Sequence, residues 1–100
     1  MLEEDQIIKV LYDMAGTFKK LMMEKEYMKA VLCADEVATA IMCLNVDESI
    51  RKEIFGERDK NNPVIGLIDE GQYIKALDWC IYHGFSQTVH TFENVMKKEH

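Results

Sequence analysis

The chain has 100 residues, of which 48% are apolar and 30% are charged, with five glycines and one proline. This length and composition predict a single folded domain over residues 1–100 and exclude a disordered or low-complexity chain. Nucleic acid is not expected as a partner, because the net charge is −6 and the longest basic groupings are pairs such as Arg51-Lys52, which are typical of solvated helix surface.

The N-terminal half carries two stripes of apolar residues at helical spacing. The first stripe consists of Ile7, Ile8, Leu11, Met14, Ala15, Phe18, Leu21 and Met22, and the second runs from Tyr27 to Leu44. Either the chain turns tightly at residues 24–26 into an antiparallel second helix, or one helix of roughly 40 residues continues with a rotated face. We expect the turn, because globular helices average ~11–12 residues and a single long helix would leave both stripes unpaired.

A short third helix is expected between Asp47 and Gly56. Aspartate is a favoured residue at the start of a helix, and glycine is the residue that most commonly ends one. The apolar side of this helix would consist of Ile50, Ile54 and Phe55. A polar loop, "ERDKNN", follows it.

Two more helices are expected on either side of Gly71. Asn62 before Pro63 predicts the start of a fourth helix, with Asn62 as its cap and Pro63 in the first helical position. Gly71 is expected to end this short helix, because glycine adopts the left-handed conformation at no steric cost. A fifth helix is expected over about residues 73–83, ended by Gly84.

The last helix is expected to begin with Ser86 as its cap and to carry Val89, Phe92 and Met96 on its apolar side. No alternating run of β-branched residues indicates a strand anywhere in the sequence. The expected fold class is therefore all-α, with five or six short helices in antiparallel hairpins, arranged either as repeats or as an irregular helical bundle.

A weak internal repeat is centred on the stretch "GQYIKALDWC" at residues 71–80. Tyr73, Ala76 and Leu77 correspond to Tyr27, Ala30 and Val31, and each pair is 46 positions apart. In each set the tyrosine stands at the expected start of a helix, and the alanine follows about one turn later. The order of Gly71, Tyr73, Ala76 and Leu77 resembles the junction of a tetratricopeptide repeat, in which glycine makes the turn, tyrosine packs over it and alanine permits close approach of the helices.

The resemblance covers residues 63–82 well and residues 14–43 poorly, and it implies about two degenerate repeats. The sequence departs from the family's pattern because no glycine precedes Tyr27 and Phe18 stands where a small residue is usual. Tetratricopeptide-like domains are interaction modules, so the resemblance implies a groove that holds a peptide or helix of a partner protein. Small acidic members include chaperones of bacterial specialised secretion systems, to which this chain is similar in size, acidity and helix content.

One cluster of residues has the types that ligate metals. Cys80 and His83 would share one side of a helix, His90 would approach from the next helix, and Cys33 or Cys43 would complete the set. The simpler interpretation is that Cys80 is a small core residue and that His83 satisfies helix-end carbonyls. We therefore expect no cofactor and no enzymatic activity, since a cysteine–histidine pair on one helix lacks an oxyanion hole.

The expected compartment follows from hydropathy and cysteine content. The longest apolar runs, such as "AIMCL" at 40–44, are far shorter than the ~20 residues that cross a bilayer, so no membrane partner is expected. The first residues, "MLEEDQ", are acidic where an export signal is basic and then apolar. The three cysteines form no Cys-x-x-Cys pair. These features predict a cytoplasmic protein.

Three residues lie off the predicted core stripes and are candidates for contacting a partner: Tyr12, Met23 and Met28. Methionine side chains on a surface adapt to apolar helices of varied shape, although they also fill gaps beside a core. The sequence therefore predicts a non-catalytic cytoplasmic protein–protein interaction module or a small chaperone-like adaptor, which also forms a homo-oligomer. The alternative is a metal-binding helical protein or sensor that uses Cys80, His83 and His90.

Overall fold

The computed structural model describes residues 3–58 and 63–99, and these residues form six α-helices and no strand. The helices are α1 (Glu4–Met23), α2 (Tyr27–Cys43), α3 (Glu48–Phe55), α4 (Val64–Asp69), α5 (Tyr73–His83) and α6 (Phe85–Glu99). The predicted all-α fold class is confirmed. Of the expected five or six helices, the described residues form six.

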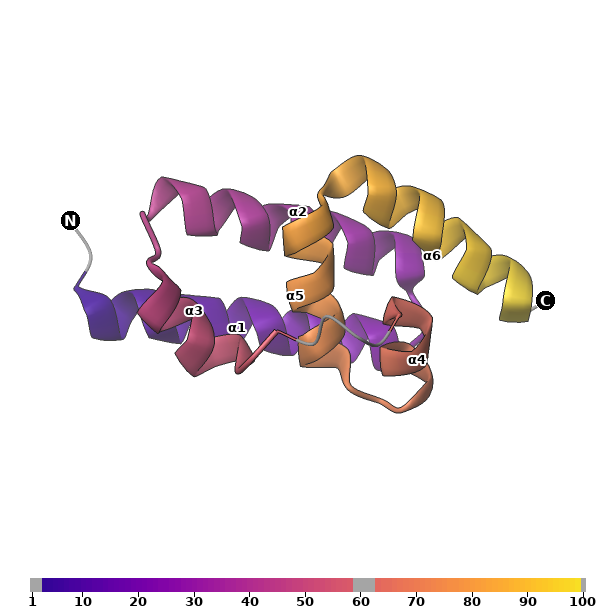
Figure 1. The fold of residues 1–100 in the computed structure, drawn as a ribbon, viewed down its shortest axis with the longest axis horizontal. Coiled ribbons are helices and arrows are strands. Elements are labelled where there is room, and N and C mark those ends of the chain that lie inside the picture. The colour runs from indigo at the N-terminus through magenta and orange to yellow at the C-terminus, as the bar shows by residue number, and fades with distance from the viewer. Residues whose placement is uncertain (1–2, 59–62, 100) are drawn as a thin grey trace.

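The longest helices, α1 and α2, run antiparallel and form the hairpin on which the other helices pack (Figure 1). α5 crosses this hairpin and packs against each of the other five helices. α3 packs on α1 near its start, α4 packs on α5, and α6 runs along the first half of α2. α3, α5 and α6 thus pack directly on the α1–α2 hairpin.

The turn between α1 and α2 confirms the predicted hairpin. Lys25 adopts the left-handed conformation, with φ 59°. Its N–H donates to the carbonyl of Met22, and the N–H of Glu26 donates to the carbonyl of Leu21, at 3.0 and 2.9 Å. This pair of hydrogen bonds is the Schellman arrangement, which satisfies carbonyls at a helix end. A glycine is usual at such a position, and the chain forms the turn with a lysine at a cost of roughly 1–2 kcal/mol.

The turn between α4 and α5 has the same hydrogen bonds. Gly71 has φ 73°, its N–H donates to the carbonyl of Ile68, and the N–H of Gln72 donates to the carbonyl of Leu67, at 3.0 and 2.8 Å. Gly71 therefore ends the fourth helix as predicted, and residues 63–83 are not one continuous helix.

The residues on either side of these two turns also match in backbone conformation. Glu24 and Glu70 have φ −85° and −86° with ψ 0° in both, and Glu26 and Gln72 have φ −87° in both with ψ 67° and 66°. The two turns thus share one backbone shape. The same pair of hydrogen bonds also ends α2, where Asn45 has φ 51°, so this is a common way for a helix to end.

The core is a single cluster to which all six helices contribute. Its buried apolar residues are Leu11, Ala15, Phe18, Met22, Tyr27, Ala30, Val31, Cys33, Ala34, Val37, Ile50, Ile54, Phe55, Val64, Leu67, Ala76, Leu77, Cys80, Phe92 and Val95. The corresponding alanines of the repeat, Ala30 and Ala76, both have no exposed surface. Tyr73 is half-buried, whereas Tyr27 is buried and its ring meets Phe92 of α6 edge-on at 6.4 Å between centroids.

The limits of α3 follow the prediction. The N–H of Ile50 donates to Oδ1 of Asp47 at 2.9 Å, so Asp47 caps the helix. Gly56 follows the helix with φ 73°, and its N–H donates to the carbonyl of Lys52 at 2.8 Å. Gly56 therefore ends α3, as the sequence predicted.

The predicted starts of α4 and α6 are wrong by one or two residues. Pro63 is extended, with ψ 153°, and its carbonyl accepts the first helical hydrogen bond, so it is the cap and not the first helical residue. The predicted cap Asn62 lies outside the described residues. α6 begins at Phe85, because the N–H of Thr88 already donates to the carbonyl of Gly84, and Ser86 lies within the first turn.

Candidate interaction surface

An exposed stripe of side chains runs along α2 on the side opposite its buried residues Ala30 and Val37. We call it the α2 stripe, and it consists of Met28, Leu32, Asp35, Thr39 and Met42. Steps of four and three residues keep these side chains on one side of a helix. Met28, Leu32 and Met42 are 46%, 55% and 77% exposed, so three large apolar side chains of one helix face solvent.

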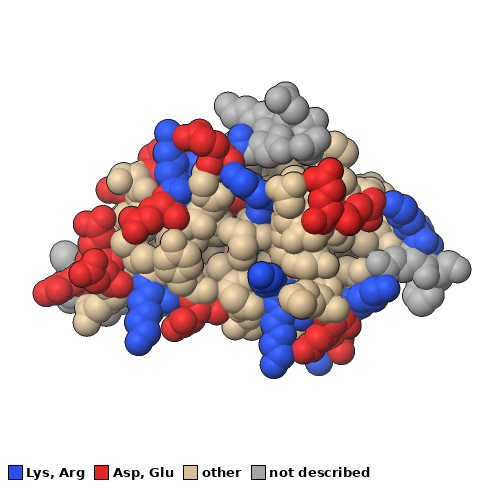
Figure 2. All heavy atoms as spheres, turned by 90° about the horizontal axis from the view of Figure 1, so that it is seen from below, with Lys and Arg blue, Asp and Glu red and all other residues tan. Residues whose placement is uncertain are grey.

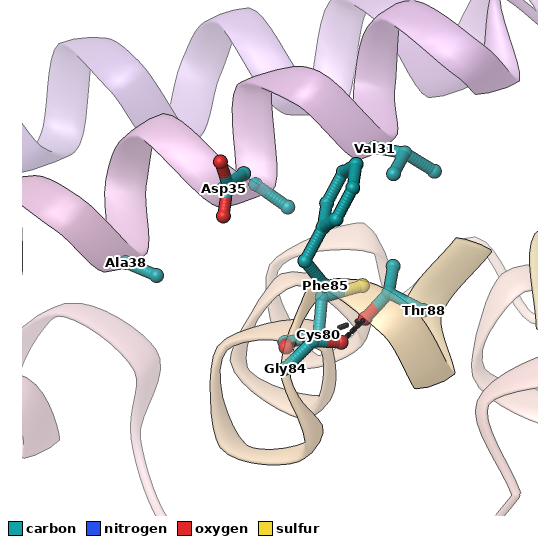
Figure 3. Close-up of a pocket in the computed structure, with 8 residues that line it drawn as sticks. Val31, Asp35, Ala38, Cys80, Gly84, Phe85 and Thr88 are labelled. Carbon is teal, nitrogen blue, oxygen red and sulfur yellow. Dashed lines mark hydrogen bonds between the residues drawn. The ribbon is translucent and has the colours of Figure 1, made fainter.

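The ring of Phe85, the first residue of α6, lies beside this stripe. Phe85 is 47% exposed, and its ring stands between Val31 and Asp35 of α2 (Figure 3). It covers a hollow that is lined by Val31, Ala34, Asp35, Ala38, Cys80, Gly84, Phe85 and Thr88. The hollow has a volume of about 20 Å³, which is room for about one water molecule and not for a ligand. The accessible surface here is therefore the outer side of α2 and Phe85.

Asp35 lies at the centre of the α2 stripe, and its side chain is exposed. Its backbone carbonyl accepts a hydrogen bond from Oγ1 of Thr39 at 3.0 Å. Among the described residues, none donates a hydrogen bond to the Asp35 carboxylate or forms an ion pair with it. One charged group without a partner among the described residues thus sits beside Leu32 and Phe85.

The three partner-contact residues predicted from the sequence are all exposed, but they do not form one compact patch. The hydroxyl of Tyr12 donates to the carbonyl of Glu53 at 3.1 Å, so this side chain ties α1 to α3. Met23 lies eleven residues further along α1, which is ~16 Å at 1.5 Å per residue. Met23 and Met28 flank the α1–α2 turn, and only Met28 belongs to the α2 stripe.

The prediction missed Leu32 and Phe85 and did not assign Met42 to a surface. The 4-3-4-3 spacing of the α2 stripe is visible in the sequence, but the sequence does not show which sides of α2 are covered by α5 and α6. Phe85 could not be placed because the start of α6 was expected after it. An apolar stripe on the polar side of a predicted helix was the signal that could have indicated this surface.

The residues of the metal alternative are not brought together as a ligand set. No group of three or more histidine, cysteine, aspartate or glutamate side chains that could hold a metal occurs among the residues described by the structure. Cys80 is buried, and burial raises the pKa of its thiol to about 12, which opposes the thiolate that a metal needs. Nδ1 of His83 lies 3.0 Å from the carbonyl of Trp79, and the two rings stack at 4.2 Å, while His90 is exposed on α6.

A buried ionic cluster joins α3 and the segment after it to α5. Asp78 is only 2% exposed, and its carboxylate accepts hydrogen bonds from Arg51 at 3.0 Å and from two nitrogens of Arg58, each at 3.0 Å. Arg51 also donates to Glu48, and these hydrogen bonds lower the pKa of the Glu48 carboxyl. The guanidinium of Arg58 lies 4.4 Å from the ring centre of Tyr82, which accounts for this exposed aromatic.

This cluster corrects the prediction that the Arg51-Lys52 pair is solvated. Lys52 is exposed, whereas Arg51 is buried and forms ion pairs with Glu48 and Asp78. The cluster contains two carboxylates and two guanidinium groups, so its charges balance. It is a structural feature of the domain that was not predicted from the sequence, because its residues come from separate segments.

A second hollow lies between α4 and α6, and it has a volume of about 110 Å³. Its lining residues are Ile65, Ile68, Asp69, Val95 and Lys98. Lys98 and Asp69 form an ion pair across it at 3.0 Å, and both side chains are more than half exposed. Such a solvated ion pair contributes little stability. The lining residues also supply no set of converging polar groups, which a ligand site usually has.

Charged groups are mixed over the face seen in Figure 2, where acidic side chains gather toward the end at which α1 begins and no continuous basic area appears. None of the helices in the described residues has the length and apolar character needed to span a bilayer. No protein-family model matches the chain, and neither a curated protein nor a solved structure matches it significantly. The surface of α2 must therefore be interpreted on its own geometry.

Proposed function

We propose that this chain is a non-catalytic protein-binding module that holds an apolar helix or peptide of a partner protein. The observation that carries the proposal is the exposure of Met28, Leu32 and Met42 in one line on α2, with Phe85 beside them. Adjoining apolar side chains on the surface of a small domain mark interaction sites more often than isolated ones do. Thioethers and an aromatic ring suit such a site, because they adapt to apolar partners.

The α2 stripe has the dimensions of a helix-binding surface. Fourteen residues separate Met28 from Met42, which is ~21 Å along the axis, or about four turns of a partner helix. Helix recognition of this kind uses anchors spaced at three and four residues on both partners. A partner helix would therefore lie along α2, next to the start of α6.

The two matching turns support the repeat-like part of the proposal. Glu24–Glu26 and Glu70–Gln72 have the same backbone conformation and each leads directly into a helix, whereas the similar end of α2 at Asn45 is followed by the extended residue Asp47. In the proposal the chain is a degenerate tetratricopeptide-like adaptor that acts in the cytoplasm and, like a chaperone, covers an apolar segment of its client. Function is inferred here from the surface, because a fold of this kind serves many purposes.

The proposal is tested by capturing partners from the native cell on the immobilised chain. Leu32→Gln and Met28→Gln should each reduce the captured partner by about ten-fold or more, as expected for central apolar anchors. Val10→Gln is the matched control, because Val10 is an exposed apolar residue on α1, away from the α2 stripe. Partners that bind both α2 variants as well as the wild type, or the absence of any partner, would contradict the proposal.

The homo-oligomer predicted from the sequence remains a prediction. It would use Met23 and Met28 at the α1–α2 turn, since Tyr12 is engaged with α3. Light scattering at tens of micromolar should then show a dimer for the wild type and a monomer for the Met23→Glu, Met28→Glu double variant. A monomeric wild type would rule this contact out.

A further inference from the structure

We infer that the partner helix carries a lysine or arginine in the middle of its apolar face and that this residue pairs with Asp35. The inference rests on the proposed function, since it names the chemistry of the helix that the α2 stripe binds. It follows from the place of one carboxylate among apolar side chains.

The carboxylate of Asp35 decides which helices can cover the α2 stripe. A helix that buries Leu32 and Phe85 also removes water from Asp35, which is one helical turn from Leu32 and lies beside the Phe85 ring (Figure 3). A carboxylate that loses water without gaining a donor is strongly unfavourable, and the described residues supply no donor. A purely apolar helix is therefore rejected, whereas a helix with a cationic side chain at this point restores the interaction.

The surroundings of Asp35 favour a cation over a neutral donor. Glu36 is the next residue and is exposed, so it adds to the negative potential at the middle of α2. Lys29 is exposed near the N-terminal end of the helix, six residues away, which is ~9 Å along the axis. An arginine would hold the carboxylate by two hydrogen bonds, and a lysine would extend its apolar stem across Leu32 or Met28.

A second copy of this chain is a poor occupant of the same surface. Two α2 helices that pack along their stripes, parallel in register or antiparallel about the centre, bring Asp35 against Asp35 of the other copy. Like charges opposite each other at an interface cost several kcal/mol when water is excluded. A dimer through Met23 and Met28 at the turn avoids this contact and leaves Leu32, Asp35 and Met42 open.

The experiment is a display selection against the full chain with amphipathic helices of about 18 residues, all with leucine anchors at three- and four-residue spacing. One central position of the apolar face is varied among Arg, Lys, Gln, Leu and Glu. We expect Arg and Lys to be enriched about ten-fold over Gln, Leu and Glu at that position. The affinity of a selected Arg peptide, measured by fluorescence anisotropy, should fall about ten-fold for Asp35→Asn, and Asp35→Arg should prefer the Glu peptide.

Asp13→Asn is the matched control, because Asp13 is an exposed aspartate on α1 and its loss should leave the affinity unchanged. Peptides that lose binding with Leu32→Gln but show no basic preference would uphold the proposed function and overturn this inference. If no peptide is enriched, or if enrichment does not depend on Leu32, both are overturned. A basic preference that persists in Asp35→Asn would also overturn the assignment to Asp35.

Discussion

Lys25 and Gly71 occupy the same position in two turns of one shape, 46 residues apart, with φ 59° and 73°. The N–H of each residue donates to the carbonyl three positions earlier, Met22 and Ile68, at 3.0 Å. Glycine adopts this conformation without a steric penalty, whereas lysine does so at a cost of roughly 1–2 kcal/mol. The two turns thus agree in backbone conformation although their central residues differ in type.

Substitutions at the two turns should change the free energy of unfolding in opposite directions. Gly71→Ala should lower it by up to ~1 kcal/mol, because a side chain is unfavourable at positive φ, although no described atom lies within 4 Å of the added Cβ. Lys25→Gly should raise it slightly, because relief of ~1–2 kcal/mol exceeds the added entropy of the unfolded chain, ~0.4–1 kcal/mol. Urea denaturation measures both. A higher urea midpoint for Gly71→Ala would mean that α4 and α5 are one helix.

Ala76 is fully buried on the central helix α5, so we expect a larger side chain there to push neighbouring helices apart. Ala76→Leu should lower the free energy of unfolding by ~1–3 kcal/mol, and Ala30→Leu, at the corresponding buried position of α2, should do the same. Glu93→Leu on the exposed side of α6 should change it by less than ~0.5 kcal/mol. Equal effects at buried and exposed positions in urea denaturation would show that the alanines do not lie at close helix contacts.

Removal of the charge at Asp78 should destabilise the domain strongly. Asp78→Asn leaves the guanidinium groups of Arg51 and Arg58 without their shared carboxylate, and breaking a buried ion pair typically costs ~3–5 kcal/mol. Asp69→Asn, which removes the exposed ion pair with Lys98, should cost less than ~1 kcal/mol. Calorimetric or urea unfolding of both variants tests the difference. Similar values for the two would mean that the buried cluster contributes nothing beyond an exposed pair.

The three cysteines should differ in reactivity toward a thiol reagent. Cys43 is exposed, whereas Cys33 and Cys80 are buried, and burial raises the pKa of both buried thiols. At about pH 8 one thiol per chain should react rapidly with a disulfide reagent and two should react only as the protein opens, because the thiolate is the reacting form. Cys43→Ser should abolish the rapid phase, and a rapid phase of two or three thiols would contradict the burial of Cys33 and Cys80.

The Cys80 thiol should also make the domain less stable at alkaline pH. Its pKa is raised by burial from 9.0 to about 12, so the folded state retains a proton that the unfolded state loses. The contribution is intact below 9.0 and is lost as the pH rises toward 12, at up to ~1.4 kcal/mol per pH unit. Urea unfolding of wild type and Cys80→Ala from about pH 8 to about pH 11 should show a shallower decline for the variant. Parallel declines would indicate an accessible thiol.

Periodicity predicted α1, α2 and the turn between them, because the apolar stripe changes phase at Lys25. The short helices were predicted from residues that begin and end helices, such as Asp47 and Gly71. The positive φ of Lys25 itself was not predicted, since a lysine carries no local signal for the left-handed conformation. The partners of Asp78 could not be found, because Arg51 and Arg58 come from segments whose approach depends on the packing of α3 on α5. Which side of α2 is exposed likewise depends on the helices that cover it. Of the α2 stripe, only Met28 was therefore predicted from the sequence as a contact residue.

Because α5 is central, we expect this domain to unfold differently from a linear array of repeats. In an array each unit contacts only its neighbours, and unfolding can start at one end. Here α5 packs against all five other helices, so its amides can exchange hydrogen with water only when the whole domain opens. The α1–α2 pair and the α4–α5 pair are therefore expected to unfold together, and neither should persist when the other is melted or cut away.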